Sequence, residues 1–297
     1  MADTKLIYSI HSVTSHDGTI IGYRQMGSGP GLILIHGGMA SSQTFMTLAT
    51  ILSDDFTVYI PDRRGRGLSG PFGNNYCIQK EIEDLDAIIN KTDAHYIFGL
   101  SSGAVIAIKA SLHLHSINKL ALYEPPLAID HSMIEKHDLY MQRFDHEIIN
   151  NELGAAFVTI LKGLEIMPFP LNYIPHFLLV PFFTMAIKED AKNVKENDVS
   201  LVELIPTQHF DYQLIIETKG SIVDFKGVCS QVLLLGGSKS PMFLKHSLDK
   251  LNNMLICAKR IEFRGLGHTA PIDNKQPEQV AHELRKFFIT NKCKQKK

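Results

Sequence analysis

The chain has 297 residues, of which 44% are hydrophobic and 21% are charged, as is usual for a protein with a folded core. Its 30 basic and 31 acidic side chains give a formal net charge of -1, so no broad positive surface is available for the phosphates of a nucleic acid. The composition therefore excludes a largely disordered chain and argues against a nucleic-acid-binding protein.

Short strand-like apolar runs alternate with longer runs that carry apolar residues at helical spacing. The first two strand-like runs, residues 6–14 and 19–26, flank a turn-like His-Asp-Gly sequence and predict an opening hairpin. Further short strands are predicted at residues 32–35, 56–60, 96–98, 120–123, 232–235 and 260–263. Helices are predicted at residues 42–52, 77–91 and 277–290. This alternation is typical of the α/β class, in which helices cover a mostly parallel sheet.

Residues 126–226 interrupt the alternation, because they are helix-like and rich in methionine, phenylalanine, isoleucine and proline. We interpret them as a helical cap inserted into a core domain that consists of residues 1–125 and 227–297. Such a cap would cover the carboxyl ends of the parallel strands, where sheets of this class bind ligands, and would exclude water there. A second packing layer without a pocket is the alternative.

Four apolar side chains in and near the cap are the candidates for the wall of a substrate pocket: Met39, Met167, Phe169 and Phe182. Side chains of this kind favour a mainly apolar substrate. The core of the cap itself is the alternative place for them, and we expect it to hold most of the apolar cap residues.

The uncharged stretch at residues 166–187 is long enough for a membrane-spanning helix. Four prolines interrupt it, at positions 168, 170, 175 and 181, and a proline inside a helix removes a hydrogen bond and distorts the backbone. We therefore interpret the stretch as a broken apolar lid. Contact of this lid with a lipid surface stays an alternative.

The four cysteines, Cys77, Cys229, Cys257 and Cys293, lack the short paired spacings of a metal site or a redox motif. No secretory leader precedes the first strand-like run. We expect a protein of the reducing cytoplasm that holds no metal ion. The basic run at residues 292–297 is interpreted as a solvated tail.

Residues 96–107 pass from a strand-like run through Gly-Leu-Ser-Ser-Gly into a helix-like run. A nucleophilic serine at such a strand-to-helix turn sits in a strained backbone conformation with its hydroxyl exposed, and the sharp turn needs small residues on both sides. Gly99 and Gly103 supply that room around Ser101. The context predicts a nucleophile elbow.

Three more segments accompany the elbow in a fixed order: Leu-Ile-His-Gly-Gly at residues 34–38, Pro-Asp-Arg-Arg-Gly-Arg-Gly-Leu-Ser at residues 61–69, and Gly-Leu-Gly-His at residues 265–268. With this combination the chain resembles the α/β-hydrolases over about residues 10–290. The resemblance implies an eight-stranded, mostly parallel sheet with helices on both faces and a helical cap. It also implies a hydrolase that needs no cofactor.

The resemblance implies that Ser101 is the nucleophile and that His268 is the base that removes its proton, since a neutral hydroxyl is a weak attacker at neutral pH. An oxyanion hole would come from the backbone N–H groups of Ser102 and Gly38, the former at the positive end of a helix dipole. We expect His36 to hold its loop by a hydrogen bond rather than to act as a base.

The loop at residues 62–69 resembles a family segment that organises the loops beneath the active site. We expect it to be scaffold, with arginines that are solvated or paired with Asp62. Binding of an anionic substrate by these arginines is the alternative.

The chain departs from the family pattern at the carboxylate that orients the histidine, because Ser240 occupies the usual place and a serine hydroxyl supplies no charge. Glu124 is the best substitute, since it follows the predicted strand next to the elbow and adjacent strand ends lie only about 5 Å apart. Asp224 and Asp273 are the rivals for this role.

These residues predict a serine hydrolase that cleaves a small apolar carboxylic ester, or a related acyl compound, through an acyl-enzyme. A serine rather than an aspartate at the elbow argues against dehalogenase and epoxide-hydrolase chemistry. A carbon-carbon bond hydrolase, a lactonase and a cofactor-free perhydrolase on the same fold stay open. A ligand-binding receptor that keeps the fold without turnover is the alternative from another class.

Overall fold

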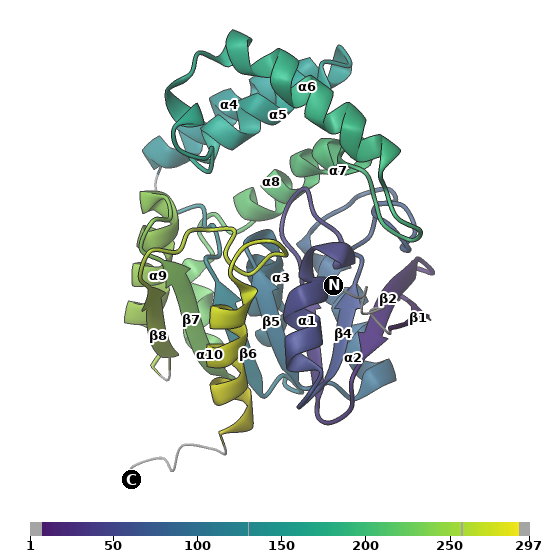
Figure 1. The fold of residues 1–297 in the computed structure, drawn as a ribbon. Coiled ribbons are helices and arrows are strands. Elements are labelled where there is room, and N and C mark those ends of the chain that lie inside the picture. The colour runs from purple at the N-terminus through teal and green to yellow at the C-terminus, as the bar shows by residue number, and fades with distance from the viewer. Residues whose placement is uncertain (1–7, 130, 257, 291–297) are drawn as a thin grey trace.

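The computed structural model describes residues 8–129, 131–256 and 258–290, so Cys257, Cys293, the basic run at residues 292–297 and the first two residues of the predicted hairpin lie outside the described part. An eight-stranded sheet with the order β1-β2-β4-β3-β5-β6-β7-β8 forms its centre (Figure 1). The strands are β1 (Ser9–Thr14), β2 (Ile20–Met26), β3 (Gly31–Ile35), β4 (Thr57–Pro61), β5 (Tyr96–Leu100), β6 (Lys119–Tyr123), β7 (Gln231–Gly237) and β8 (Ala258–Phe263).

The first two strands form an antiparallel hairpin, and β2 also pairs antiparallel to β4. All other neighbouring strands, from β4 through β3 to β8, run parallel. The central strands are continuous apolar runs because both faces of the sheet are covered, and every residue of β6 is buried. The predicted α/β fold with its mostly parallel eight-stranded sheet and opening hairpin is confirmed.

Five helices of the core lie against the sheet: α1 (Met46–Leu52), α2 (Ile78–Thr92), α3 (Ser102–Ser111), α9 (Met242–Met254) and α10 (Pro277–Ile289). The apolar side chains of α2, α3 and α9 belong to one buried cluster and those of α1 and α10 to another. Successive residues of β3 alternate between the two clusters, with Ile33 in the first and Leu34 in the second. The sheet is therefore the middle of three layers.

The chain between β6 and β7 is helical. It forms α4 (His131–Ile149), α5 (Leu153–Gly163), α6 (His176–Lys192), α7 (Leu201–Leu204) and α8 (Gln208–Ile216), with short 3-10 turns between some of them. In Figure 1, α4, α5 and α6 lie as a separate layer beyond one end of the strands, and α7 and α8 lie between this layer and the core. We call residues 131–216 the cap segment. The division of the chain into a core domain and a cap over residues 126–226 stays our interpretation.

The cap segment buries apolar side chains of its own. Met141, Phe144 and Ile160 belong to one buried cluster, and Met167 and Leu179 belong to a second. Several large apolar side chains on and before α6 are instead exposed: Phe169, Tyr173, Phe177, Leu178, Phe182 and Met185. Among the described helices none has the length and apolar character needed to cross a membrane. Contact with a lipid surface stays a prediction.

Candidate active site

Ser101 sits at the turn between β5 and α3 with a φ of 55° and a ψ of -124°, a conformation that is strained for a residue other than glycine. A Cβ added to Gly99 would lie 2.5 Å from the carbonyl oxygen of Gly103, and one added to Gly103 would lie 2.4 Å from that of Ile35. Both clashes are with backbone, so only glycine fits at either position. The strand-to-helix turn predicted around Ser101 is present.

Glu124 and His268 meet although they come from distant parts of the chain. Nδ1 of His268 lies 2.7 Å from Oε2 of Glu124, which directly follows β6. The other carboxylate oxygen of Glu124, Oε1, accepts the backbone N–H of Gly237 at 2.6 Å, and the glutamate side chain is fully buried. A carboxylate without a proton only accepts, so in that pairing Nδ1 is the donor and the lone pair of a neutral ring lies on Nε2.

The loop that carries His268 is tied to the ends of two strands. Gly265 donates its backbone N–H to Oγ of Ser238 at 2.8 Å, and Tyr123 donates its hydroxyl to the carbonyl oxygen of Gly267 at 2.8 Å. These bonds fix the backbone on both sides of Leu266, which is itself buried. The imidazole is therefore held on a well-anchored loop, with only 13% of its side chain exposed.

The residues around Glu124 leave room for a carboxylate that directly follows β6. A Cβ added to Gly236 would lie 3.0 Å from Oε1 of Glu124, so the glycine at the end of β7 leaves the space that the glutamate occupies. Ser240, at the usual family position of the acid, is buried, and its hydroxyl makes no hydrogen bond to the described residues. Of the two rivals, Asp273 accepts the backbone N–H of Thr47, and Asp224 lies in a 3-10 turn; neither bonds to His268.

The structure does not join Ser101 to His268 by a hydrogen bond within the described residues. It does place Ser101 beside the loop at residues 36–39, since a Cβ added to Gly37 would lie 3.0 Å from Cβ and 3.7 Å from Oγ of Ser101. The backbone N–H of Ser101 bonds to the carbonyl oxygen of Tyr123 at 2.9 Å, so the serine stands next to the residue that precedes Glu124. The catalytic roles of these side chains stay proposals.

Ser102 follows this serine directly, and Gly38 follows Gly37, the glycine that lies against the serine side chain. Neither the backbone N–H of Ser102 nor that of Gly38 donates to a protein acceptor among the hydrogen bonds of the described residues. Ser102 is the first residue of the ten-residue helix α3, where N–H groups are free and the helix dipole is positive. Two free donors next to a strained serine are suited to bind an oxyanion, and this assignment stays a proposal.

His36 holds its own loop, as expected. Its Nε2 accepts the backbone N–H of Arg63 at 3.2 Å, so Nδ1 carries the proton and donates to the carbonyl oxygen of Gly37 at 2.9 Å. Burial and the nearby Arg66 and Arg63 hold the pKa of His36 well below its ordinary value. The ring is therefore neutral and acts as a structural link.

The arginines of the loop at residues 62–69 are neither solvated nor paired with Asp62, and our expectation about them is wrong. Asp62 accepts the backbone N–H groups of Ser42 and Leu68 instead. The arginines are buried and pair with other carboxylates: Arg63 with Glu81 at 2.8 Å, Arg64 with Asp84 at 2.6 Å, and Arg63 and Arg66 with Asp211 at 2.6 Å and 2.5 Å. The backbone satisfies Asp62, which leaves the arginines free to bind elsewhere.

Asp211 is the residue near the site that sequence reasoning missed. It belongs to α8 of the cap segment, is 1% exposed and accepts the hydroxyl of Ser102 at 2.7 Å. No local motif marks it, because its partners lie more than 100 positions away in the chain. The loop at residues 62–69 has three arginines and one aspartate. This excess of positive charge was the one sequence signal that carboxylates from other segments must pair with the arginines.

The four side chains predicted to line a pocket lie in different surroundings. Met39 packs against the apolar cluster of the cap segment, and Met167 is buried inside that segment. Phe169 is 82% exposed and Phe182 is 54% exposed, and their rings contact Tyr173 and Phe183. Met39 is therefore the one of the four that connects the loop beside Ser101 with the cap segment. The role of all four in a pocket stays a prediction.

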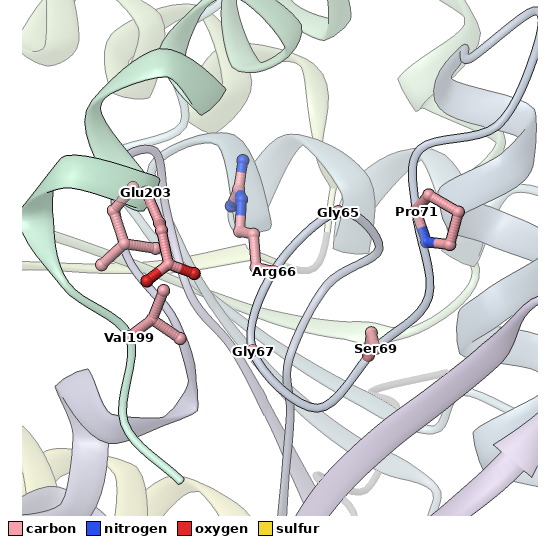
Figure 2. Close-up of a pocket in the computed structure, with 8 residues that line it drawn as sticks. Gly65, Arg66, Gly67, Ser69, Pro71, Val199 and Glu203 are labelled. Carbon is pink, nitrogen blue, oxygen red and sulfur yellow. The ribbon is translucent and has the colours of Figure 1, made fainter. Parts of the chain in front are cut away.

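A polar cavity of about 210 Å³ lies between the loop at residues 65–71 and the cap residues around α7 (Figure 2). Its wall includes Arg66, Ser69, Pro71, Val199 and Glu203. Neither Ser101 nor His268 lines it. Within the described part of the chain, no group of three or more His, Cys, Asp or Glu side chains is arranged to hold a metal ion.

Known proteins share this fold and parts of the sequence. The uncharacterized hydrolase YraK of Bacillus subtilis is 32% identical over 153 residues, which are 50% of this chain and 55% of that protein. The match thus spans about half the length of that relative. A cis-3-alkyl-4-alkyloxetan-2-one decarboxylase from Shewanella oneidensis is 24% identical over 98% of this chain and 91% of its own length.

A solved α/β hydrolase from Sphaerobacter thermophilus superposes with a TM-score of 0.73 at 25% identity, over 94% of this chain and all of the other. The family model of the alpha/beta hydrolase fold matches residues 30–275, which run from β3 to beyond His268. Together with the observed sheet order and the strained serine, this match shows that the chain belongs to the alpha/beta hydrolase family.

Proposed function

We propose that this protein hydrolyses a carboxylic ester, or a related acyl compound, through an acyl-enzyme on Ser101. The observation that carries the proposal is the hydrogen bond of 2.7 Å between Glu124 and His268, on the same edge of the sheet as the strained Ser101. A neutral imidazole with its Nε2 free is the general base that a serine nucleophile needs.

The proposed reaction has two stages. In the first, Oγ of Ser101 attacks the ester carbonyl while Nε2 of His268 takes the hydroxyl proton, and Glu124 stabilises the imidazolium that forms. The oxyanion is bound by the N–H groups of Gly38 and Ser102, and the imidazolium then protonates the leaving alcohol. In the second stage, water activated by the same imidazole attacks the acyl-enzyme and releases the carboxylic acid and Ser101.

An apolar acyl or alcohol group is the proposed substrate feature. Met39 follows the proposed oxyanion donor Gly38 and packs against the apolar cluster of the cap segment to which Phe144 and Ile160 belong. Lactones are also tested, because the relative from Shewanella oneidensis is named for an oxetan-2-one, which is a cyclic ester. The substrate panel therefore covers 4-nitrophenyl esters of increasing chain length, lactones and thioesters.

Two measurements on the purified protein test the proposal. A fluorophosphonate probe reacts with an activated serine, so we expect it to label the wild type and to leave Ser101→Ala and His268→Ala unlabelled. Hydrolysis of the 4-nitrophenyl esters should be lost in the same two variants. Ser116→Ala, which removes an exposed serine hydroxyl beyond the other end of α3, is the matched control and should keep both activities.

A ligand-binding receptor predicts the opposite pattern. The wild type would then stay unlabelled by the fluorophosphonate and would hydrolyse none of the esters, while an apolar ester still stabilises it against thermal unfolding. That combination would contradict the proposed hydrolase.

A further inference from the structure

We propose that Asp211, in α8 of the cap segment, is a positioning residue for the oxyanion hole, so that the cap segment completes the catalytic machinery of the core. The inference rests on the proposed function, because it assigns Gly38 and Ser102 as the oxyanion donors. It starts from the buried ion pairs that join Asp211 of α8 to Arg63 and Arg66 in the loop at residues 62–69.

The first contact of Asp211 is with the residue after the nucleophile. Oδ1 of Asp211 accepts the hydroxyl of Ser102 at 2.7 Å, and the same oxygen accepts Nη1 of Arg63 at 2.6 Å. Arg63 in turn lies 3.2 Å from Oγ of Ser102. The side chain of Ser102 is thus held by two charged partners, and this fixes the first residue of α3, whose backbone N–H is the proposed donor.

The second contact is with the loop that supplies the other donor. Oδ2 of Asp211 pairs with Nη2 of Arg66 at 2.5 Å, and Nη1 of Arg66 donates to the carbonyl oxygen of Gly37 at 3.3 Å. A Cβ added to Gly38 would lie 3.3 Å from the carboxylate of Asp211 and 2.6 Å from Oε1 of Gln208, also in α8. Helix α8 therefore packs directly on the Gly38 backbone.

Asp211 stays ionised, and two arginines balance its negative charge. Burial alone would raise the pKa of Asp211, but Arg66, Arg63 and the hydroxyl of Ser102 outweigh burial and hold this pKa at about 2. A bare carboxylate next to an oxyanion would repel it, whereas here two guanidinium groups flank the carboxylate. The pairs give the site rigid support without a net negative charge from the cap segment.

Through these contacts one carboxylate is linked to both segments that carry the proposed donors, directly to Ser102 and through Arg66 to Gly37. The turn at Ser102 and the loop at residues 36–39 are separate in the chain. The side chain of Asp211 is linked to both through buried hydrogen bonds and ion pairs, and we infer that it sets their spacing. Misplacement of such donors by a fraction of an ångström weakens the stabilisation of the transition state, while substrate binding is changed much less. We therefore expect kcat to fall more than KM rises when Asp211 is altered.

The test compares 4-nitrophenyl butanoate with its thionoester, in which sulfur replaces the carbonyl oxygen. Sulfur is a poor hydrogen-bond acceptor, so the ratio of the two rates reports on the oxyanion hole. In Asp211→Asn we expect the ester rate per titrated active site to fall about tenfold or more, with the thionoester rate less affected and the ratio reduced. Asp138→Asn, which removes a cap carboxylate whose hydrogen bond among the described residues is to Tyr212 of α8, is the control and should keep the ratio.

Two further measurements keep the inference open to contradiction. Ser102→Ala removes only the hydroxyl contact and should lower the ratio in the same direction, which decides the matter if Asp211→Asn does not fold. Hydrogen exchange of the peptides that cover residues 36–39 and 101–104 should become faster in both variants and stay unchanged in Asp138→Asn. This exchange measurement needs no substrate, so absence of hydrolysis in the wild type would contradict the proposed function and leave the positioning role to be decided by exchange.

An unchanged rate ratio together with unchanged exchange in these peptides would overturn the inference. The same holds for equal losses of the ester and thionoester rates, because a purely structural role of Asp211 would reduce both alike.

Discussion

Oε2 of Glu124 lies 2.7 Å from Nδ1 of His268, although the two residues are 144 positions apart in the chain. The glutamate has a φ of 49° and directly follows a fully buried strand, so its backbone turns sharply at the point where its side chain begins. A strained, buried carboxylate with a single imidazole partner is typical of a functional position.

Removal of the charge of Glu124 should abolish most of the activity. In Glu124→Gln the amide would donate to Nδ1 of His268, so that the proton moves to Nε2 and the imidazole no longer accepts the proton of Ser101. We expect kcat for 4-nitrophenyl butanoate to fall by about 10³- to 10⁴-fold, with a smaller change in KM. Ser240→Ala is the control, because the hydroxyl of Ser240 makes no hydrogen bond to the described residues. Equal rates in the wild type and Glu124→Gln would show that another group orients the histidine.

The space beside Glu124 should be as important as its charge. In Gly236→Ala the new methyl group would lie 2.6 Å from Cδ1 of Leu248 and 3.0 Å from Oε1 of Glu124. We expect the glutamate to be displaced, with a loss of kcat of about tenfold or more and a loss of stability of about 1–3 kcal/mol. Steady-state kinetics and chemical denaturation measure the two effects. Gly227→Ala, where the nearest atom would be 3.6 Å away, should change neither, and identical behaviour of the two variants would refute the steric argument.

Glu81, one of the two buried carboxylate partners of Arg63, should stabilise the fold strongly. Glu81 accepts Nη2 of Arg63 at 2.8 Å and the hydroxyl of Tyr76 at 2.5 Å. In Glu81→Gln the guanidinium loses a buried counter-charge, and we expect a loss of about 3–5 kcal/mol in the free energy of unfolding. Glu83→Gln, on the same helix but in a partly exposed pair with Lys80, should cost about 0–1 kcal/mol in urea denaturation. If Glu81→Gln lowered the free energy of unfolding no more than Glu83→Gln, the stabilising role of the buried pair between Glu81 and Arg63 would be contradicted.

Acid should weaken the protein partly through Asp211. Its pKa falls from an ordinary value of 3.8 to about 2 in the folded state, so the folded state binds fewer protons than the unfolded state between these two values. The stabilisation is therefore complete above about pH 4 and is lost as the pH falls toward 2. We expect the unfolding free energy of Asp211→Asn to depend less steeply on pH in this range, by at most about 1.4 kcal/mol per pH unit. Denaturant titrations at several pH values measure this dependence. Equal slopes of unfolding free energy against pH for the wild type and Asp211→Asn would contradict the prediction.

Most of the sheet could be predicted from the sequence because its strands are short apolar runs separated by helices at regular intervals. The runs at residues 96–98 and 120–123 became β5 and β6 with a shift of at most two residues at either end. Strands buried on both faces carry a strong hydrophobic signal that does not depend on distant partners. The elbow was predictable for a similar reason, since the glycines around Ser101 meet requirements of the local backbone.

The surroundings of the site were less predictable because they depend on contacts between distant segments. The bond between Arg63 and Asp211 joins residues 148 positions apart, and neither sequence context indicates the other. The helical spacing of apolar residues in α6 does not tell which face is covered, so the exposure of Phe177 and Phe182 could not be derived from it. Glu124 could be predicted because the end of the strand that precedes it, at Tyr123, could be predicted from the apolar run.

The order of the proposed catalytic groups along the chain has a consequence for synthesis. Ser101 and Glu124 belong to one strand-helix-strand unit, β5-α3-β6, in which the backbone of Ser101 is bonded to that of Tyr123. His268 follows after the whole cap segment and β8. A growing chain on the ribosome therefore exposes the nucleophile and its orienting carboxylate long before the base, and it has no competent attacking group until translation has passed β8. The proposed activity would thus begin only once the cap segment has already been made.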